Sequence, residues 1–212
     1  MSNVKTTEDA HAYVKYLDTY LPSIKPPSLI LKSSTGGKLL LGGIDVLKSG
    51  HATAYDHIIS ITNQSQLDYA LHSSILLNTA QKRDFHWAAD DVFFDISQYF
   101  DTVAEAIEDS LKEGKTVYVH CFMGKSRSAA CVVAYLIEFR GMSFFEAVDF
   151  VGCKRHAVCI NSGFGVQLQK YAERVKLEGA KCEGKMHECE EEAVGKDNVK
   201  QTVNALAEEV GR

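Results

Sequence analysis

The chain has 212 residues and 45% of them are hydrophobic, so it is long enough to bury one full core. A formal net charge of −5 argues against a surface that binds nucleic acid or anionic membranes. No apolar run approaches the roughly 18 residues of a membrane span, and no secretory signal opens the sequence. The six cysteines lack the spacing of a disulfide framework, so we expect a reducing compartment, the cytoplasm or the nucleus.

Residues 1–27 are expected to form a short helical extension. Apolar side chains recur there at helical spacing, and prolines then break the chain. These residues are Ala10, Tyr13, Val14 and Leu17, followed by Pro22, Pro26 and Pro27.

Short apolar runs then predict the first strands. Residues 28–31 and 38–41 flank Thr35-Gly36-Gly37, a sequence that favours a β-hairpin. A crossover helix within 45–54 is expected to lead to a buried parallel strand over 57–62. Residues 74–77 are a further strand candidate.

A short strand around Phe85 and Trp87 runs into an acidic loop with Asp90 and Asp91. Asp95 and Gln98 have the spacing of a capping box, which predicts the start of a helix. That helix is expected to end at Gly114, a residue suited to the left-handed stop of a helix. Its apolar face contains Ile96, Tyr99, Phe100, Val103, Ile107 and Leu111.

The segment 117–135 predicts a strand, a tight loop and a helix. Val117 and Val119 are typical of a buried strand, and residues 128–140 are apolar nearly all round. A strand that turns directly into a helix points the N–H groups of the loop into one concavity, where the helix N-terminus adds about half a positive charge. Gly124 permits the tight bend, so the sequence predicts an anion cradle of phosphate size.

Cys121 and Arg127 lie at opposite ends of this loop. Arg127 can offer a bidentate fork to phosphate oxygens. Positive groups lower the pKa of a nearby thiol, so we expect Cys121 to be a thiolate nucleophile beneath a bound phosphate. The expected phosphate-binding residues are Phe122, Met123, Gly124, Lys125, Ser126 and Arg127.

Two more helices are predicted downstream. Ser143 and Glu146 have the spacing of a capping box, and residues 152–160 are expected to be a connection. Asn161 then opens the last helix of the domain.

The composition becomes charged from Lys176, so residues 177–212 predict a flexible tail. The tail holds Cys182, His187 and Cys189. They lack a fourth ligand at zinc-finger spacing, so no metal site is expected.

The pattern His120-Cys121-x5-Arg127-Ser128 resembles the signature of the cysteine-based protein tyrosine phosphatases, and Gly124 to Ala129 is most similar to their dual-specificity branch. Leu39 to Gly43 resembles the strand that opens such domains. Asn161 to Leu168 resembles another family segment, with Ile160 in place of the usual proline.

The resemblance covers roughly Ser28 to Tyr171 and implies a catalytic domain over 28–176. The implied fold is α/β, with a central, mostly parallel sheet of about five strands flanked by helices. The phosphate-binding loop is expected between a strand and a helix.

The implied reaction has two steps and needs no metal or other cofactor. Cys121 attacks phosphorus to form a phosphocysteine, which water then hydrolyses. The resemblance implies that Ser128 donates a hydrogen bond to the sulfur, and that His120 orders the loop and helps to lower the thiol pKa. Asn161 is expected to brace the cradle, or to serve only as a helix N-cap. Lys125 either adds positive charge at the rim or is simply a solvated lysine.

The leaving oxygen needs a proton from a carboxylic acid above the cradle. In the family this aspartate lies six residues before the hydrophobic residue that opens the next helix, which leads from Ile96 back to Asp90. Asp91 is the competing candidate. The small turn residues that usually follow the acid are here Val92-Phe93-Phe94.

The resemblance implies a small dual-specificity protein phosphatase that acts on phosphotyrosine and on phosphoserine or phosphothreonine, with a protein kinase among its candidate substrates. A second hypothesis is a phosphatase of phosphoinositides or of another non-protein phosphomonoester. A third is a phospho-residue binding module that has lost catalysis, although Cys121 and Arg127 are both present. The sequence makes no prediction about oligomeric state.

Overall fold

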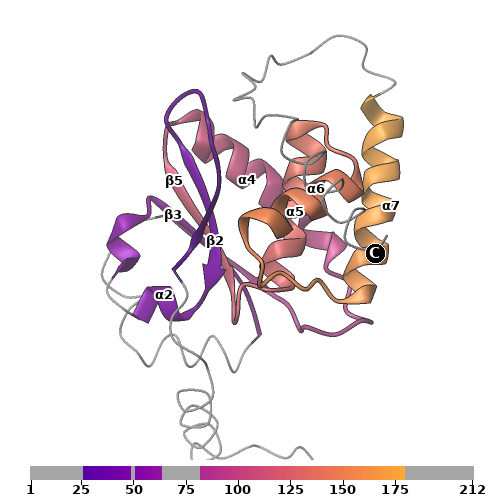
Figure 1. Ribbon diagram of the computed structural model, residues 1–212, viewed down its shortest axis with the longest axis horizontal. Coiled ribbons are helices and arrows are strands. Elements are labelled where there is room, and N and C mark those ends of the chain that lie inside the picture. The colour runs from indigo at the N-terminus through magenta and orange to yellow at the C-terminus, as the bar shows by residue number, and fades with distance from the viewer. Residues whose placement is uncertain (1–25, 49–50, 64–81, 180–212) are drawn as a thin grey trace, which may run out of the picture. The chain divides into compact units, whose positions relative to one another are not determined.

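The computed structural model describes residues 26–48, 51–63 and 82–179 (Figure 1). The predicted N-terminal helix, the strand candidate at 74–77 and the tail from residue 180 lie outside these residues. The strands are β1 (Ser28–Lys32), β2 (Lys38–Gly43), β3 (His57–Thr62), β4 (Lys82–Trp87) and β5 (Thr116–Cys121). The helices are α2 (Asp45–Lys48), α4 (Phe100–Lys112), α5 (Arg127–Arg140), α6 (Phe144–Lys154) and α7 (Ser162–Gly179), with 3-10 turns η1 (His51–Ala54) and η2 (Ser97–Tyr99).

The five strands form one sheet in the order β1-β2-β5-β3-β4. β1 and β2 are antiparallel and form the predicted hairpin, while β2, β5, β3 and β4 run parallel to one another. The predicted mostly parallel sheet is therefore confirmed. β5 is its central strand, and in such sheets ligands bind beyond the carboxyl ends of the strands.

Side chains alternate along β5 and divide the core into two parts. Val117, Val119 and Cys121 belong to a large apolar cluster with residues of α4, α5, α6 and α7, the helices that gather on one side of the sheet in Figure 1. Tyr118 belongs to a smaller cluster with residues of α2 and β3. The predicted buried helix is α5, in which every residue from Arg127 to Ile137 is buried.

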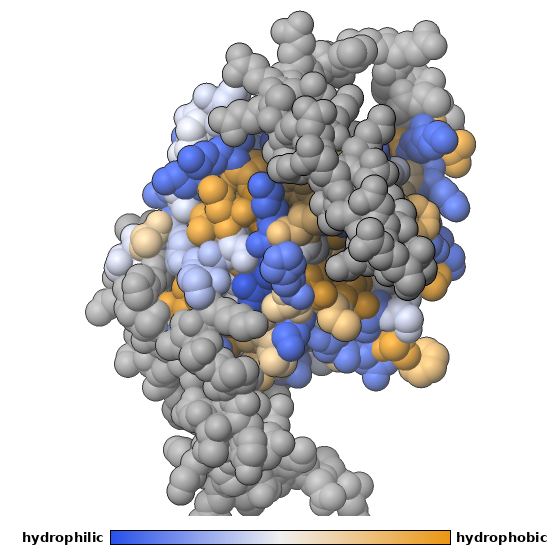
Figure 2. Space-filling view, viewed as in Figure 1, coloured by the Kyte–Doolittle hydropathy of each residue, from blue (hydrophilic) through white to orange (hydrophobic). Residues whose placement is uncertain are grey.

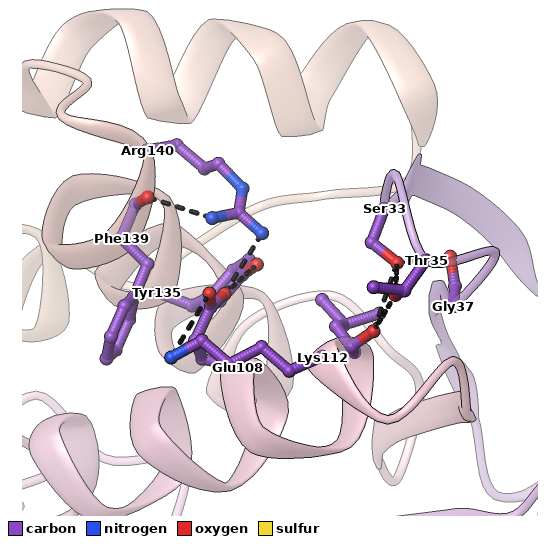
Figure 3. Close-up of polar contacts among 9 residues, drawn as sticks. Ser33, Thr35, Gly37, Glu108, Lys112, Tyr135, Phe139 and Arg140 are labelled. Carbon is purple, nitrogen blue, oxygen red and sulfur yellow. Dashed lines mark hydrogen bonds and ion pairs between the residues drawn. The ribbon is translucent and has the colours of Figure 1, made fainter. Parts of the chain in front are cut away.

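Polar contacts fix α4 against α5 and against the hairpin (Figure 3). The buried Glu108 carboxylate accepts hydrogen bonds from the Tyr135 hydroxyl and from Arg140 Nη2, each at 3.0 Å. At the other contact, the hydroxyl groups of Ser33 and Thr35 both donate to the carbonyl oxygen of Leu111. These bonds hold the helix whose first turn follows the acidic loop.

Several local predictions differ from the structure. The segment 45–54 contains the short elements α2 and η1 instead of one crossover helix. Asp95 does not form a capping box, because its carboxylate accepts bonds from the N–H and the hydroxyl of Ser97, at 3.1 and 2.6 Å. The predicted capping box of Ser143 and Glu146 is present, but α6 runs to Lys154 and shortens the expected connection over 152–160. In the described part of the chain, no helix has the length and apolar character needed to span a bilayer.

Candidate active site

Cys121 ends the central strand β5 and is 1% exposed. The chain turns tightly after it, and the N–H of Gly124 donates to Cys121 Sγ at 3.2 Å. Gly124 has a φ of 66°, and a Cβ atom there would lie 2.3 Å from the carbonyl carbon of Gly42. Only glycine fits this position, as expected from the tight bend.

The pKa of the Cys121 thiol reflects opposing effects. Burial raises the pKa, but the Arg127 charge, the nearby Ser128 hydroxyl and the N–H groups of Ser128 and Lys125 lower it by more. The net pKa lies below the ordinary value of the thiol, so the thiolate is favoured. Burial raises the pKa of Cys131, which therefore remains a thiol.

The loop turns its N–H groups inward because its carbonyl groups are bonded outward. Successive carbonyl oxygens accept hydrogen bonds from donors outside the loop: Phe122 O from Ile44 N (3.1 Å), Met123 O from Arg155 Nη2 (3.2 Å), Gly124 O from Arg155 Nε (2.8 Å) and Lys125 O from Cys159 N (2.9 Å). A peptide unit whose carbonyl points away from a concavity points its N–H into it. The inward N–H groups of this loop can together hold one anion.

Arg155 was missed by the sequence analysis, since it lies in the segment predicted only as a connection. It is 6% exposed and lies behind the cradle. Burial lowers its pKa, and the nearby Cys121 thiolate opposes that shift. A guanidinium stays protonated in proteins, so Arg155 brings a second positive charge toward the thiolate from behind the loop.

Asp90 lies over the cradle. Its Oδ1 accepts hydrogen bonds from Ser126 Oγ at 2.7 Å and from Asn161 Nδ2 at 2.8 Å, and its Oδ2 lies 3.7 Å from Arg127 Nε. Asp91 instead accepts a bond from the N–H of Phe93, within its own turn. The geometry therefore brings Asp90, and not Asp91, next to the predicted phosphate site.

Arg127 is 4% exposed and opens α5. Its Nη1 donates to the carbonyl oxygen of Ala88 at 3.2 Å. This bond ties the guanidinium to the chain just before Asp90. Lys125 is exposed on the outside of the loop, as a solvated lysine would be.

The start of α7 supports the acidic loop. Asn161 caps the helix through Oδ1, which accepts from the N–H of Phe164 at 2.9 Å, while its Nδ2 donates to Asp90 Oδ1 at 2.8 Å. Gln167 donates from Nε2 to the carbonyl of Phe94 at 2.8 Å. A Cβ atom on Gly163 would lie 1.9 Å from the carbonyl oxygen of Val92. Neither Gln167 nor Gly163 was predicted as a site residue, although both lie in the segment that resembles the family.

His120 orders the loop through hydrogen bonds. Its Nδ1 lies 3.2 Å from the carbonyl oxygen of Cys121, and its Nε2 lies 2.7 Å from Ser60 Oγ. Burial, together with the nearby Arg127 charge, lowers its pKa to about 4, so the ring is neutral at pH 7. A neutral ring that donates from Nδ1 accepts a hydrogen bond from the Ser60 hydroxyl at Nε2. The expected lowering of the thiol pKa therefore comes from Arg127, Ser128 and Lys125, and not from a charge on His120.

Among the residues that the structure describes, no group of three or more His, Cys, Asp or Glu side chains is arranged to hold a metal ion. Cys182, His187 and Cys189 lie outside the described residues.

The chain matches the family model described as dual specificity phosphatase, catalytic domain, over residues 48–174. It is 32% identical over 148 residues to dual specificity protein phosphatase 1B of Arabidopsis thaliana, an alignment that covers 66% of this chain and 89% of the relative. It is 44% identical over 92 residues to dual specificity protein phosphatase 13B of Mus musculus, covering 43% of this chain and 46% of the relative. The crystal structure of a human tyrosine phosphatase-like serine/threonine/tyrosine-interacting protein superimposes with a TM-score of 0.59 and 29% identity, covering 71% of this chain and 97% of that one.

Proposed function

This chain belongs to the dual specificity phosphatase family and is a protein phosphatase, and we propose that it hydrolyses phosphotyrosine and phosphoserine or phosphothreonine through a phosphocysteine at Cys121. The observation that supports this mechanism is a buried thiol of lowered pKa beneath a loop whose carbonyl groups all point outward. Arg127 adds a buried positive charge at the same place. Such a site binds the dianionic phosphate and activates the nucleophile together.

In the first step the Cys121 thiolate attacks phosphorus, so that a P–S bond forms and the P–O bond to the substrate side chain breaks. The N–H groups of the loop and the Arg127 guanidinium hold the remaining phosphoryl oxygens. Asp90 gives its proton to the leaving oxygen. Ser126 and Asn161 both donate to Oδ1, which fixes the Asp90 carboxyl group over the cradle.

In the second step water attacks the phosphocysteine, the P–S bond breaks and inorganic phosphate forms. The Asp90 carboxylate takes a proton from the water. The buried Ser128 hydroxyl donates to the departing sulfur, which lowers the basicity of the leaving thiolate. The same residue therefore helps the thiolate to attack and to leave.

The test is hydrolysis of para-nitrophenyl phosphate in EDTA by the wild type and by Cys121→Ser. We expect metal-free turnover, lowered about 10³-fold or more in the variant because the nucleophile is lost. Binding of phosphopeptides should persist in Cys121→Ser. A variant rate close to that of the wild type would exclude Cys121 as the nucleophile.

Substrate class is measured next, as kcat/KM for phosphopeptides against soluble phosphoinositide headgroups. We expect phosphopeptides to be preferred, since Lys125 is the only lysine between Cys121 and Arg127. A wild type that binds phosphopeptides without releasing phosphate would instead support the binding-module hypothesis. A phosphorylated protein kinase stays a candidate substrate.

A further inference from the structure

Exposed apolar side chains lie beside the acidic loop. Phe93 is 93% exposed, Val92 is 42% exposed and Val166 of α7 is 50% exposed. We call these three residues the apolar rim. On the face drawn in Figure 2, apolar residues lie among polar ones, which is ordinary for a protein surface, so exposure alone does not mark a binding surface. The position of the rim beside Asp90 is what distinguishes it.

The acidic loop contacts the start of α7, the helix that carries Val166. Gly163 approaches Val92 so closely that a Cβ atom would lie 1.9 Å from the Val92 carbonyl oxygen. Val166 follows Gly163 by three positions, and residues with this spacing share one face of a helix. Val166 is therefore on the side of α7 that faces the acidic loop.

The turn that presents Phe93 is fixed at both ends. The N–H of Phe93 donates to Asp91 Oδ1 at 2.8 Å, and the N–H of Phe94 donates to the Asp91 carbonyl at 3.1 Å. The Phe94 ring packs against Trp87 with a centroid distance of 5.4 Å, and Gln167 holds the Phe94 carbonyl. Phe93 is thus held outward, three residues after Asp90, and its side chain is almost fully exposed to solvent.

We propose, on the basis of the protein phosphatase function above, that the apolar rim binds an apolar side chain of the substrate within two residues of the phosphorylated one. Asp90 must reach the leaving oxygen, so the peptide backbone has to pass beside the acidic loop. Successive residues of an extended peptide are about 3.3 Å apart, which brings the neighbours of the phosphorylated residue within reach of Phe93. The enzyme therefore selects phosphopeptides with residues such as Leu, Ile or Phe next to the phosphorylated position.

The charges around the rim favour a peptide over a membrane surface. Asp90, Asp91 and Asp95 lie on the same loop and are exposed, and the whole chain has a net charge of −5. Anionic lipid headgroups would be repelled by these carboxylates. An apolar side chain of a peptide carries no charge that these carboxylates repel.

The experiment uses a phosphotyrosine peptide with only Gly and Ser around the phosphorylated residue, and four variants with one Leu at position −2, −1, +1 or +2. We expect kcat/KM of the wild type to rise about fivefold to tenfold for at least one Leu position, because the Leu side chain is buried against the rim. In Phe93→Ser, the ratio of kcat/KM for the best Leu peptide to kcat/KM for the Gly/Ser peptide should fall to about one to two. Phe145→Ser is the matched control, since Phe145 on α6 is 71% exposed and lies outside the site, and it should keep the wild-type ratio.

The outcomes separate the two proposals. Equal kcat/KM for all five peptides, or an unchanged Leu preference in Phe93→Ser, would overturn the rim and leave the phosphatase function intact. A wild type inactive on every peptide and on para-nitrophenyl phosphate would overturn the proposed function, and the rim with it. A third outcome is that hydrolysis of a phosphoinositide in phosphatidylcholine vesicles depends on Phe93 while the peptides show no Leu preference. That outcome would assign the rim to a lipid surface and overturn the peptide proposal. Thermal unfolding of Phe93→Ser at the wild-type temperature checks that the fold is retained.

Discussion

The carbonyl oxygen of Gly124 accepts a hydrogen bond at 2.8 Å from Nε of Arg155, the residue that follows α6. Arg155 Nη2 holds the neighbouring carbonyl of Met123 in the same way. One planar guanidinium therefore sets the direction of two peptide units of the cradle. Arg155 is a positioning residue, because it shapes the phosphate site from behind without facing the substrate.

Replacement of Arg155 should weaken phosphate binding. Arg155→Met leaves the carbonyl groups of Met123 and Gly124 without these donors, at a cost of about 1–3 kcal/mol each. We expect kcat/KM for para-nitrophenyl phosphate to fall about 100-fold, with a matching rise in the inhibition constant of inorganic phosphate. Arg155→Lys should recover part of the loss, because the charge returns without the planar fork. Lys154→Met, which removes an exposed neighbouring charge, is the control; an equal loss there would attribute the effect to charge alone.

The thiolate of Cys121 should depend on Arg127. Burial of Cys121 disfavours the thiolate, and this burial remains in Arg127→Met. The variant loses the positive charge that favours the thiolate, so the pKa of Cys121 should rise. Alkylation by iodoacetamide should accordingly need a higher pH in the variant. Mass spectrometry of the tryptic peptide 116–125 reports Cys121 apart from the exposed Cys153 and Cys159. The same alkylation profile in both proteins would argue against Arg127 as the main stabilising charge.

Asp90→Asn should slow hydrolysis most for substrates that have a poor leaving group. The variant cannot protonate the leaving oxygen, so we expect kcat for a phosphotyrosine peptide to fall about 100-fold or more. The loss should be smaller for para-nitrophenyl phosphate, whose leaving group needs less protonation. Asp91→Asn keeps an oxygen acceptor for the N–H of Phe93 and should stay within a few-fold of wild type. The reverse pattern would make Asp91 the acid.

Gly163→Ala should displace the acidic loop. The new Cβ atom meets the backbone of Val92, which cannot move without shifting Asp90, so activity and stability should both fall. Gly165→Ala is the matched control, because apart from the neighbouring residues and backbone of its own helix no described atom lies within 4 Å of its Cβ position. There the gain in helix propensity should stabilise the protein by up to about 1 kcal/mol. Kinetics and urea unfolding measure both effects, and an active, stable Gly163→Ala would refute the close contact.

His120 should make stability depend on pH. Burial lowers its pKa from 6.5 to about 4 in the folded protein, so between these values the unfolded chain binds more protons. Stability is then fully present above pH 6.5 and is lost as the pH falls toward 4, by about 3 kcal/mol in all. Urea unfolding at several pH values gives the free energy of unfolding as a function of pH. This free energy should change less steeply with pH in His120→Asn than in the wild type. The exposed His156→Asn is expected to keep the wild-type slope. If the free energy of unfolding depended equally on pH in all three proteins, the pKa of His120 would be the same in the folded and unfolded states.

The acidic loop illustrates where local patterns fail. Asp95 and Gln98 have the spacing of a capping box, but the N–H groups of Ile96 and Ser97 donate to Gln167 Oε1, at 2.9 and 3.0 Å. A side chain about 70 residues away in the sequence supplies the acceptor. By contrast, the capping box of Ser143 and Glu146 forms as predicted, because no distant group competes for its donors among the contacts described.

The sequence by itself determined the cradle. Strand, Gly124 and helix are consecutive, so the placement of Cys121 and Arg127 at the two ends of one loop follows from local conformation. The tertiary structure alone decided which aspartate lies over the cradle and what holds the cradle open. Asn161 lies 71 positions from Asp90, and Arg155 lies 31 positions from Gly124. Such contacts arise only when the sheet and α5 bring α6 and α7 against the loops, and no residue pattern along the chain encodes that proximity directly.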